Sequence, residues 1–134
     1  MIYVLDSSAM IAYLNKESGG EIVRGIIQDP GATCLAHALN LCEVYYDAHR
    51  QSGEAMAESM LAELAADGVI ERSDLDSDFW RNVGQMKSRL RRISLADACG
   101  VALTQRAAGH FVTSDHHELD RVASAGACSI LFIR

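Results

Sequence analysis

Apolar residues occur in short unbroken runs at several places along the chain. The runs at 2–5 (IYVL), 110–113 (HFVT) and 129–133 (SILFI) predict strands buried on both faces, as in a parallel sheet. Weaker runs at 32–35 and 69–72 predict two more strands of the same kind. The segments between these runs carry apolar residues at helical spacing, so the chain alternates between predicted strands and predicted helices.

Glycines mark the predicted ends of several helices. Gly68, Gly109 and Gly126 each stand at or shortly before the start of a predicted strand. The order of helix, glycine C-cap and strand is typical of an α/β protein. We therefore expect a three-layer α/β/α fold with a central, mostly parallel sheet, in which ligands bind at the carboxyl ends of the strands.

Chain length and composition favour one ordinary globular domain over residues 1–134. Almost half of the residues are hydrophobic (49%) and a single proline is present, which excludes a disordered or fibrous chain. No apolar run approaches the ~18 residues of a membrane span, and no secretory signal precedes the first strand. We therefore expect a cytoplasmic protein without a membrane partner.

The cysteines and the overall charge further limit the classes of protein that fit this sequence. The four cysteines are widely spaced in apolar surroundings, which favours buried free thiols over disulfides or a zinc site: Cys34, Cys42, Cys99 and Cys128. A formal net charge of −6 argues against a protein that wraps nucleic acid with its whole surface, although it leaves room for a local basic segment.

Four acidic residues interrupt or follow apolar segments. Asp6 directly follows the first strand, and Asp115 follows the strand at 110–113 by one residue. Glu43 and Asp97 lie in helices whose other residues are largely apolar. Each acid alone has a structural explanation: Asp6 and Asp115 as Asx turns, Glu43 as a solvent-facing residue, and Asp97 as part of a capping box.

The four acids together favour a metal site. A lone carboxylate among the apolar neighbours of Glu43 or Asp97 would be costly to bury. Several carboxylates in one place repel one another, so they take up protons or bind a divalent cation. Hard oxygen ligands suit Mg²⁺ or Mn²⁺.

The order of four short motifs resembles the PIN domain. These are D-S-S after the first strand, N-x-x-E-V on a middle helix, S-L-A-D at the start of a later helix, and T-S-D after the next strand. Size and layout further resemble VapC-type toxins of toxin-antitoxin pairs, over essentially the whole chain. The resemblance implies a Mg²⁺- or Mn²⁺-dependent endoribonuclease with a PIN-like fold, in which Asp6, Glu43, Asp97 and Asp115 are catalytic and bind the metal.

The same resemblance assigns supporting roles and partners. Ser8 and Thr113 would orient carboxylates or metal-bound water, and Asn40 lies one helical turn before Glu43 on the same face. Glu118 and Asp120 rival Asp115 for supporting work around the metal. The resemblance also implies an RNA substrate, a small antitoxin whose C-terminal segment covers the acidic site, and a homodimer.

A basic segment precedes the third motif. The sequence KSRLRR contributes four cations shortly before Ser94: Lys87, Arg89, Arg91 and Arg92. They place phosphate-binding charge beside the acids, which suits RNA binding. The alternative is a solvated helix end whose cations are favoured by the helix dipole.

Several other features have structural explanations. His116 and His117 are adjacent and complete no zinc ligand set, so we expect them at the surface. Phe79, Trp80 and Met86 recur at helical spacing and are expected in the core. The apolar stripe on the helix at 53–68 belongs either to the core or to a groove for a partner helix.

Two other functions compete with the nuclease. An aspartyl-nucleophile phosphatase on a similar sheet would use Asp6 as its nucleophile, but it calls for a second acid where the chain has Ser8. A catalytically silent PIN fold that only binds RNA or protein is the other alternative, although all four acids are present.

Overall fold

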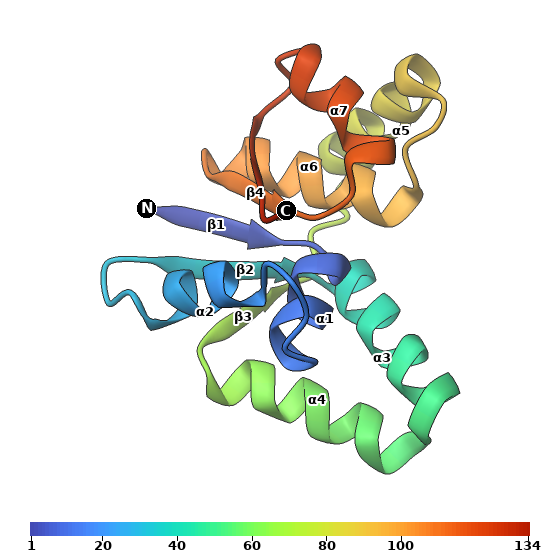
Figure 1. The fold of residues 1–134 in the computed structure, drawn as a ribbon. Coiled ribbons are helices and arrows are strands. Elements are labelled where there is room, and N and C mark those ends of the chain that lie inside the picture. Colours follow the sequence, from blue (N-terminus) through green and yellow to red (C-terminus); the bar gives the residue numbers. More distant parts are fainter.

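The computed structural model describes all residues from 1 to 134, and its five strands form one sheet (Figure 1). The strands are β1 (Ile2–Leu5), β2 (Thr33–His37), β3 (Val69–Arg72), β4 (His110–Thr113) and β5 (Ser129–Phe132). All neighbouring pairs are parallel, in the order β3-β2-β1-β4-β5. The expectation of an α/β/α fold is confirmed, and the sheet is parallel throughout.

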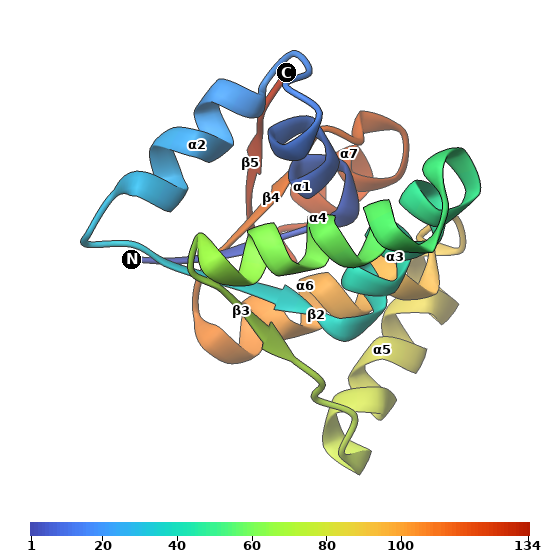
Figure 2. The same ribbon diagram turned by 90° about the horizontal axis from the view of Figure 1, so that it is seen from below.

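Seven helices cover the two faces of the sheet (Figures 1 and 2). They are α1 (Ser7–Leu14), α2 (Gly20–Gln28), α3 (Ala38–Ser52), α4 (Glu54–Ala66), α5 (Ser77–Leu90), α6 (Leu95–Ala107) and α7 (His116–Ser124). Helices α1 to α4 lie on one face, toward the viewer in Figure 2, and α5 to α7 lie on the other.

The core consists of two apolar clusters, one on each face of the sheet. Successive residues of β1 point to opposite sides: Val4 packs with α5 to α7, whereas Leu5 packs with α1 to α4. Both are fully buried. A strand that is covered on both faces requires apolar residues at every position, which explains the unbroken apolar runs in the sequence.

The strand order reverses between β1 and β4. From β1 the chain builds outward through β2 to β3, and it then returns to the other side of β1 with β4 and β5. Leu5 and Val112 are register partners, so the residues after each strand emerge side by side. A switch of this kind opens a crevice at the carboxyl ends of the strands. Asp6 and Thr113 both lie there.

Three expectations about individual residues are wrong. Trp80 is 50% exposed, because α5 buries Phe79, Val83 and Met86 and turns Trp80 to solvent. Cys42 is exposed on α3, although Cys34 and Cys99 are buried and all four thiols are free.

The third correction concerns the end of α6, where Ala108 rather than Gly109 takes the left-handed conformation (φ 53°). Gly109 is required for a different reason, since a Cβ there would lie 2.6 Å from the Ile2 carbonyl oxygen. Elsewhere in the fold, no helix combines the length and the apolar character that crossing a membrane requires.

Two glycines inside helices should respond to alanine with opposite signs. A Cβ at Gly100 in α6 would lie 2.8 Å from Cζ of the buried Phe111, whereas a Cβ at Gly84 in α5 meets nothing within 4 Å. Gly100→Ala should destabilise the fold by about 1–3 kcal/mol through overpacking. Gly84→Ala should stabilise it by about 0.5–1 kcal/mol through helix propensity. Urea unfolding measures both, and equal signs would contradict this packing of α5 and α6.

Candidate metal site

Asp6 begins the site at the junction of β1 and α1. It is the N-cap of α1, and its Oδ1 accepts hydrogen bonds from the Ala9 N–H (2.8 Å) and the Ser8 hydroxyl (2.7 Å). Its Oδ2 accepts from the Thr113 hydroxyl (2.5 Å). The side chain is 1% exposed. Asp6 therefore has the local capping role that an Asx turn implies. That role does not explain why the carboxylate is buried.

Ser8 and Thr113 connect Asp6 to the end of β4. The Ser8 hydroxyl accepts from the Ser114 N–H (3.0 Å), and the Thr113 hydroxyl accepts from the Asp115 N–H (3.0 Å). Each hydroxyl thus binds the Asp6 carboxylate on one side and the backbone after β4 on the other. The structure places both residues where they orient Asp6 and fix the backbone that carries Asp115.

Asp97 lies in the first turn of α6 and is 6% exposed. Its N–H donates to the Ser94 hydroxyl (3.1 Å), which is one half of a capping box. In a complete box the Asp97 carboxylate would accept from the Ser94 N–H. That N–H instead donates to Glu118 Oε2 from α7 (3.3 Å), so the Asp97 carboxylate is released from capping.

Glu43 approaches the site from α3. It is half-buried, and its carboxylate accepts hydrogen bonds from the Ser7 hydroxyl (3.2 Å) and the Tyr46 hydroxyl (3.4 Å). The solvent-facing alternative for Glu43 therefore does not describe it. Neither Ser7 nor Tyr46 was expected at the site, although the first serine of D-S-S and the helical spacing of Tyr46 from Glu43 are visible in the sequence.

Asp115 and Glu118 complete the acidic group from α7. Asp115 is the N-cap of α7 and accepts from the Glu118 N–H (3.2 Å). One carboxylate oxygen from each of Asp97, Asp115 and Glu118 lies within 4.8 Å of the others. Glu118 is thus a neighbour of Asp115 rather than its rival. Asp120 is exposed and pairs with His116 (2.9 Å), outside this group.

Acids from three other elements lie close enough for their charges to raise the pKa of Asp97. Burial raises the pKa of Asp97 to about 9, with further contributions from the neighbouring Glu118 side chain and from the charges of Asp6, Glu118 and Glu43. Burial also raises the pKa of Asp6 to about 6, despite its three hydrogen bonds. The pKa of Glu43 is raised, again mainly by burial. The deprotonated group is therefore unfavourable unless positive charge offsets it.

The donor set fits a small hard cation. Carboxylate oxygens at about 2.1 Å from an octahedral Mg²⁺ lie roughly 3 to 4 Å apart, and the oxygens of Asp97, Asp115 and Glu118 are already within 4.8 Å of one another. The chain brings no histidine or cysteine into this group, so the ligand chemistry suits Mg²⁺ or Mn²⁺ rather than zinc.

Asn40 lies beside the site on α3 and is fully buried. Its Nδ2 donates to the carbonyl of Ala96, the residue before Asp97 (3.3 Å), while its Oδ1 has no partner within the chain. Asn40 thus connects α3, which carries Glu43, to the start of α6. A buried amide oxygen without a partner is unusual and is consistent with a supporting role here.

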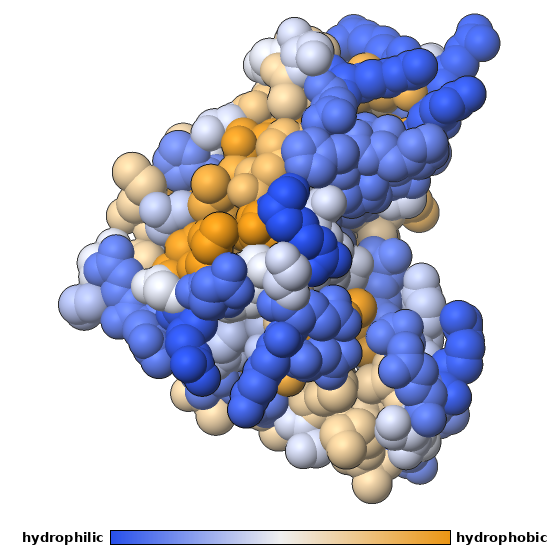
Figure 3. All heavy atoms as spheres, in the orientation of Figure 1, coloured by the Kyte–Doolittle hydropathy of each residue, from blue (hydrophilic) through white to orange (hydrophobic).

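The basic segment divides into two parts. Lys87 donates to the Ile93 carbonyl (2.5 Å), which holds the turn between α5 and α6. Arg89, Arg91 and Arg92 are exposed. Figure 3 shows an indentation of the molecular surface between the upper and lower parts of the molecule, and α3 lies on its lower side in the same orientation in Figure 1.

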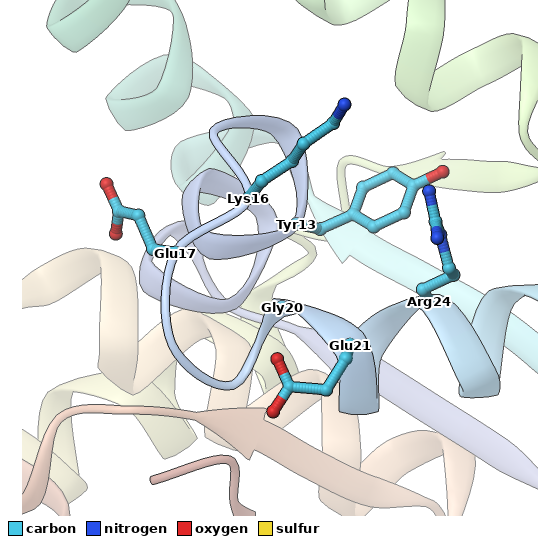
Figure 4. Close-up of a pocket in the computed structure, with 6 residues that line it drawn as sticks. All are labelled: Tyr13, Lys16, Glu17, Gly20, Glu21 and Arg24. Carbon is cyan, nitrogen blue, oxygen red and sulfur yellow. The ribbon is translucent and has the colours of Figure 1, made fainter.

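A separate cavity of about 260 Å³ lies between α1 and α2 (Figure 4). Tyr13 donates a hydrogen bond across to Asp67 at the end of α4 (2.6 Å), and Arg24 lies beside the Tyr13 hydroxyl. Its other lining residues have mixed charge: Lys16, Glu17, Gly20 and Glu21. None of the acids of the candidate metal site lines this cavity. Its Tyr13 has a structural role, since its hydroxyl connects α1 to the end of α4 through Asp67.

Together these features define a parallel α/β/α domain with an oxygen-donor site at the carboxyl edge of its sheet. Residues 3–125 match the family described as PIN domain, and the chain belongs to this family. The resemblance seen in the motifs is confirmed. No curated protein sequence matches the chain.

Solved structures agree on the fold. VapBC2 from Rickettsia felis, bound to a promoter DNA fragment, contains a chain with a TM-score of 0.74 and 15% identity, covering 98% of both chains. VapBC-1 from nontypeable Haemophilus influenzae gives 0.73 and 17%, covering 99% of this chain and 98% of that one. The Sarcin-Ricin loop cleaving toxin VapC20 from Mycobacterium tuberculosis gives 0.70 and 18%, covering 94% and 95%.

The buried acids predict an unusual dependence of stability on pH. The folded-state pKa of Asp97 (about 9) lies above its unfolded value of 3.8, so its favourable contribution is complete below pH 4 and is lost as the pH rises through 9. In EDTA, Asp97→Asn should therefore be more stable than the parent above pH 7, by on the order of 2 kcal/mol, and similar to it near pH 4.

Thermal unfolding in EDTA across this pH range measures the effect, with Glu58→Gln on the exposed face of α4 as a control that should change little. Added Mg²⁺ or Mn²⁺ should raise the melting temperature of the parent more than that of Asp97→Asn. A variant that is less stable than the parent in EDTA at pH 8.5 would contradict the repulsion inferred among these acids.

Proposed function

We propose that this PIN domain is a Mg²⁺- or Mn²⁺-dependent endoribonuclease and the toxin of a toxin-antitoxin pair. The observation that carries the proposal is the cluster of carboxylate oxygens from Asp97, Asp115 and Glu118, which lie within 4.8 Å of one another at the switch point of a parallel sheet. Asp6 and Glu43 are near enough to this cluster for their charges to raise the pKa of Asp97. A group whose deprotonated form is disfavoured by burial and mutual repulsion has an evident use as a cation site.

The residues of the site would have different roles in cation binding, according to their positions. Asp97, Asp115 and Glu118 offer the closest set of oxygens for a cation, and Asp6 and Glu43 lie within their field. Ser8 and Thr113 hold Asp6 in one orientation, and Asn40 fixes α3 against the start of α6. A divalent cation held by these oxygens would supply an activated water and would offset charge that develops on the phosphate.

Glu43 has the properties of a proton acceptor in this arrangement. Its raised pKa brings it closer to neutral pH than an exposed glutamate, and it is only half-buried, so water reaches it. Because water is the nucleophile in this scheme, no side chain forms a covalent intermediate. The products would carry a 5′-phosphate and a 3′-hydroxyl.

The structural neighbours support the choice of substrate and partner. One neighbour is described as a Sarcin-Ricin loop cleaving toxin, and others were solved as VapBC complexes. By extension we propose an RNA substrate for this chain, a small antitoxin partner, a homodimeric state, a cytoplasmic location and a single domain over residues 1–134.

The two alternatives have less support. An aspartyl nucleophile requires a carboxylate oxygen free to attack, but both Asp6 oxygens accept hydrogen bonds and the side chain is buried. A silent binding module would not need the acids gathered together. It predicts RNA binding without cleavage, and an RNA cleavage assay distinguishes the two.

Cleavage of a panel of structured RNAs, including tRNAs and rRNA loops, tests the proposal. Cleavage should require Mg²⁺ or Mn²⁺, stop in EDTA, and fall by about 10²-fold or more in Asp6→Asn and Asp97→Asn. Cleavage that survives both substitutions, or products ending in a 2′,3′-cyclic phosphate, would exclude this mechanism. The Glu58→Gln variant serves as a matched charge control.

The basic segment should separate into a structural cation and RNA-binding cations. Replacing Arg89, Arg91 or Arg92 by Gln should weaken RNA binding and lower the slope of log affinity against log salt by about 0.7 for each phosphate that is no longer neutralised. Lys87→Gln should instead mainly lower the melting temperature, because Lys87 holds the Ile93 carbonyl. Unchanged salt slopes in all three arginine variants would remove the segment from the RNA interface.

A further inference from the structure

A row of three side chains leads away from the acidic group along α3. Glu43, Tyr46 and Arg50 are spaced three and four residues apart and so lie on one face of the helix. The Tyr46 hydroxyl donates to Glu43 Oε2 (3.4 Å), and the Arg50 guanidinium carbon lies 5.3 Å from the centroid of the Tyr46 ring. The row extends roughly 10 Å from Glu43 at 1.5 Å per residue.

The two outer members of the row contribute little to the core. Helix α3 buries Asn40, Val44 and Ala48, whereas Tyr46 is 45% exposed and Arg50 is exposed. Arg50 forms no ion pair, although the protein carries an excess of acids. In Figure 1, α3 runs outward from the carboxyl edge of the sheet, and in Figure 3 it forms the lower side of the indentation.

We propose that Tyr46 and Arg50 bind single-stranded RNA next to the bond that is cleaved. An unpaired base would stack on the Tyr46 ring, and Arg50 would contact a phosphate of the same strand; the inference rests on the nuclease function proposed above. Aromatic rings and guanidinium planes both stack on splayed bases, and an unpaired cation attracts phosphate. A base within a duplex cannot reach the ring, so the row selects unpaired segments.

RNA suits this row better than a protein partner does. The ring is bonded through its hydroxyl to Glu43, so whatever stacks on Tyr46 lies directly beside the acidic group. The unpaired Arg50 provides positive charge at the far end of the row, and the exposed arginines of the basic segment lie shortly before α6, which carries Asp97. A strand that follows the row would thus have cations for its phosphates both on α3 and in the segment before α6.

The chain provides a matched control on another helix. Trp80 on α5 is also an exposed aromatic residue (50%), and Arg81 lies over its ring at 4.7 Å. The pair has the same chemistry as Tyr46 and Arg50 but no contact with the acidic group. Substitutions at Trp80 and Arg81 should leave RNA affinity unchanged.

Binding is measured apart from cleavage by placing each variant in the Asp6→Asn background with Mg²⁺. The probe is a fluorescein-labelled, unpaired oligoribonucleotide of mixed sequence, followed by anisotropy. Tyr46→Ala should weaken binding about fivefold or more, while Tyr46→Phe keeps the ring and should stay within about twofold. Arg50→Gln should lower the salt slope by about 0.7. Trp80→Ala and Arg81→Gln should change neither quantity.

The outcomes separate this inference from the nuclease proposal. If the parent cleaves RNA but Tyr46→Ala binds the probe as tightly as its background, the inference fails alone. An equal loss of affinity in Trp80→Ala would overturn it as well, since stacking would then be unspecific. If Tyr46→Ala keeps RNA affinity but no longer co-purifies with a co-expressed antitoxin, the face binds protein and the inference is wrong. Loss of affinity at Tyr46 in a protein that never cleaves RNA would overturn only the nuclease proposal.

Discussion

The main constraint on this fold is an unfavourable interaction. Carboxylates are held close together where water cannot fully solvate them, and they repel one another. The parallel sheet makes this unavoidable: Leu5 and Val112 are register partners, so the residues that follow β1 and β4 emerge side by side. Helices α3, α6 and α7 then bring their own acids to the same edge. The rest of the fold is held by two apolar clusters and by ion pairs of Arg72 and Arg106 with Asp74 and Asp76, so the repulsion among acids is concentrated at this one edge of the sheet.

Asp6 and Asp97 are both buried, yet the chain treats them differently. Asp6 receives three hydrogen bonds and its pKa reaches only about 6, so near neutral pH it is largely ionised. No backbone N–H or hydroxyl donates to the Asp97 carboxylate, and its pKa rises to about 9. The ionised form of Asp6 is therefore stabilised by hydrogen bonds within the protein. The ionised form of Asp97 has no such hydrogen bonds and would need positive charge from a bound ion. This difference makes Asp97 the acid whose protonation would change most if a cation were bound here.

The sequence was sufficient to predict the five strands, the parallel sheet and the strand ends and helices that carry the four acids, because each depends on local order along the chain. A strand that is buried on both faces must be apolar throughout, and an acid directly after it must lie at the carboxyl edge. The errors involve tertiary contacts. Neither the exposure of Trp80 nor the role of Gly109 follows from spacing, since each depends on which neighbour covers it. The proximity of Glu118 to Asp97 depends on how α7 packs against α6, which no local pattern encodes.

The capping of α6 shows how the fold and the site are joined. Ser94 and Asp97 have the spacing of a self-contained box, in which the Asp97 carboxylate would satisfy the Ser94 N–H. In the structure Glu118 satisfies that N–H, and the Asp115 that caps α7 is in turn placed by Thr113 at the end of β4. The helix therefore keeps its cap while its own acid remains available, because the cap comes from a neighbouring helix. The positions of α6 and α7 relative to each other are consequently part of the acidic group, and a cation bound there would tie together elements that are far apart in the sequence.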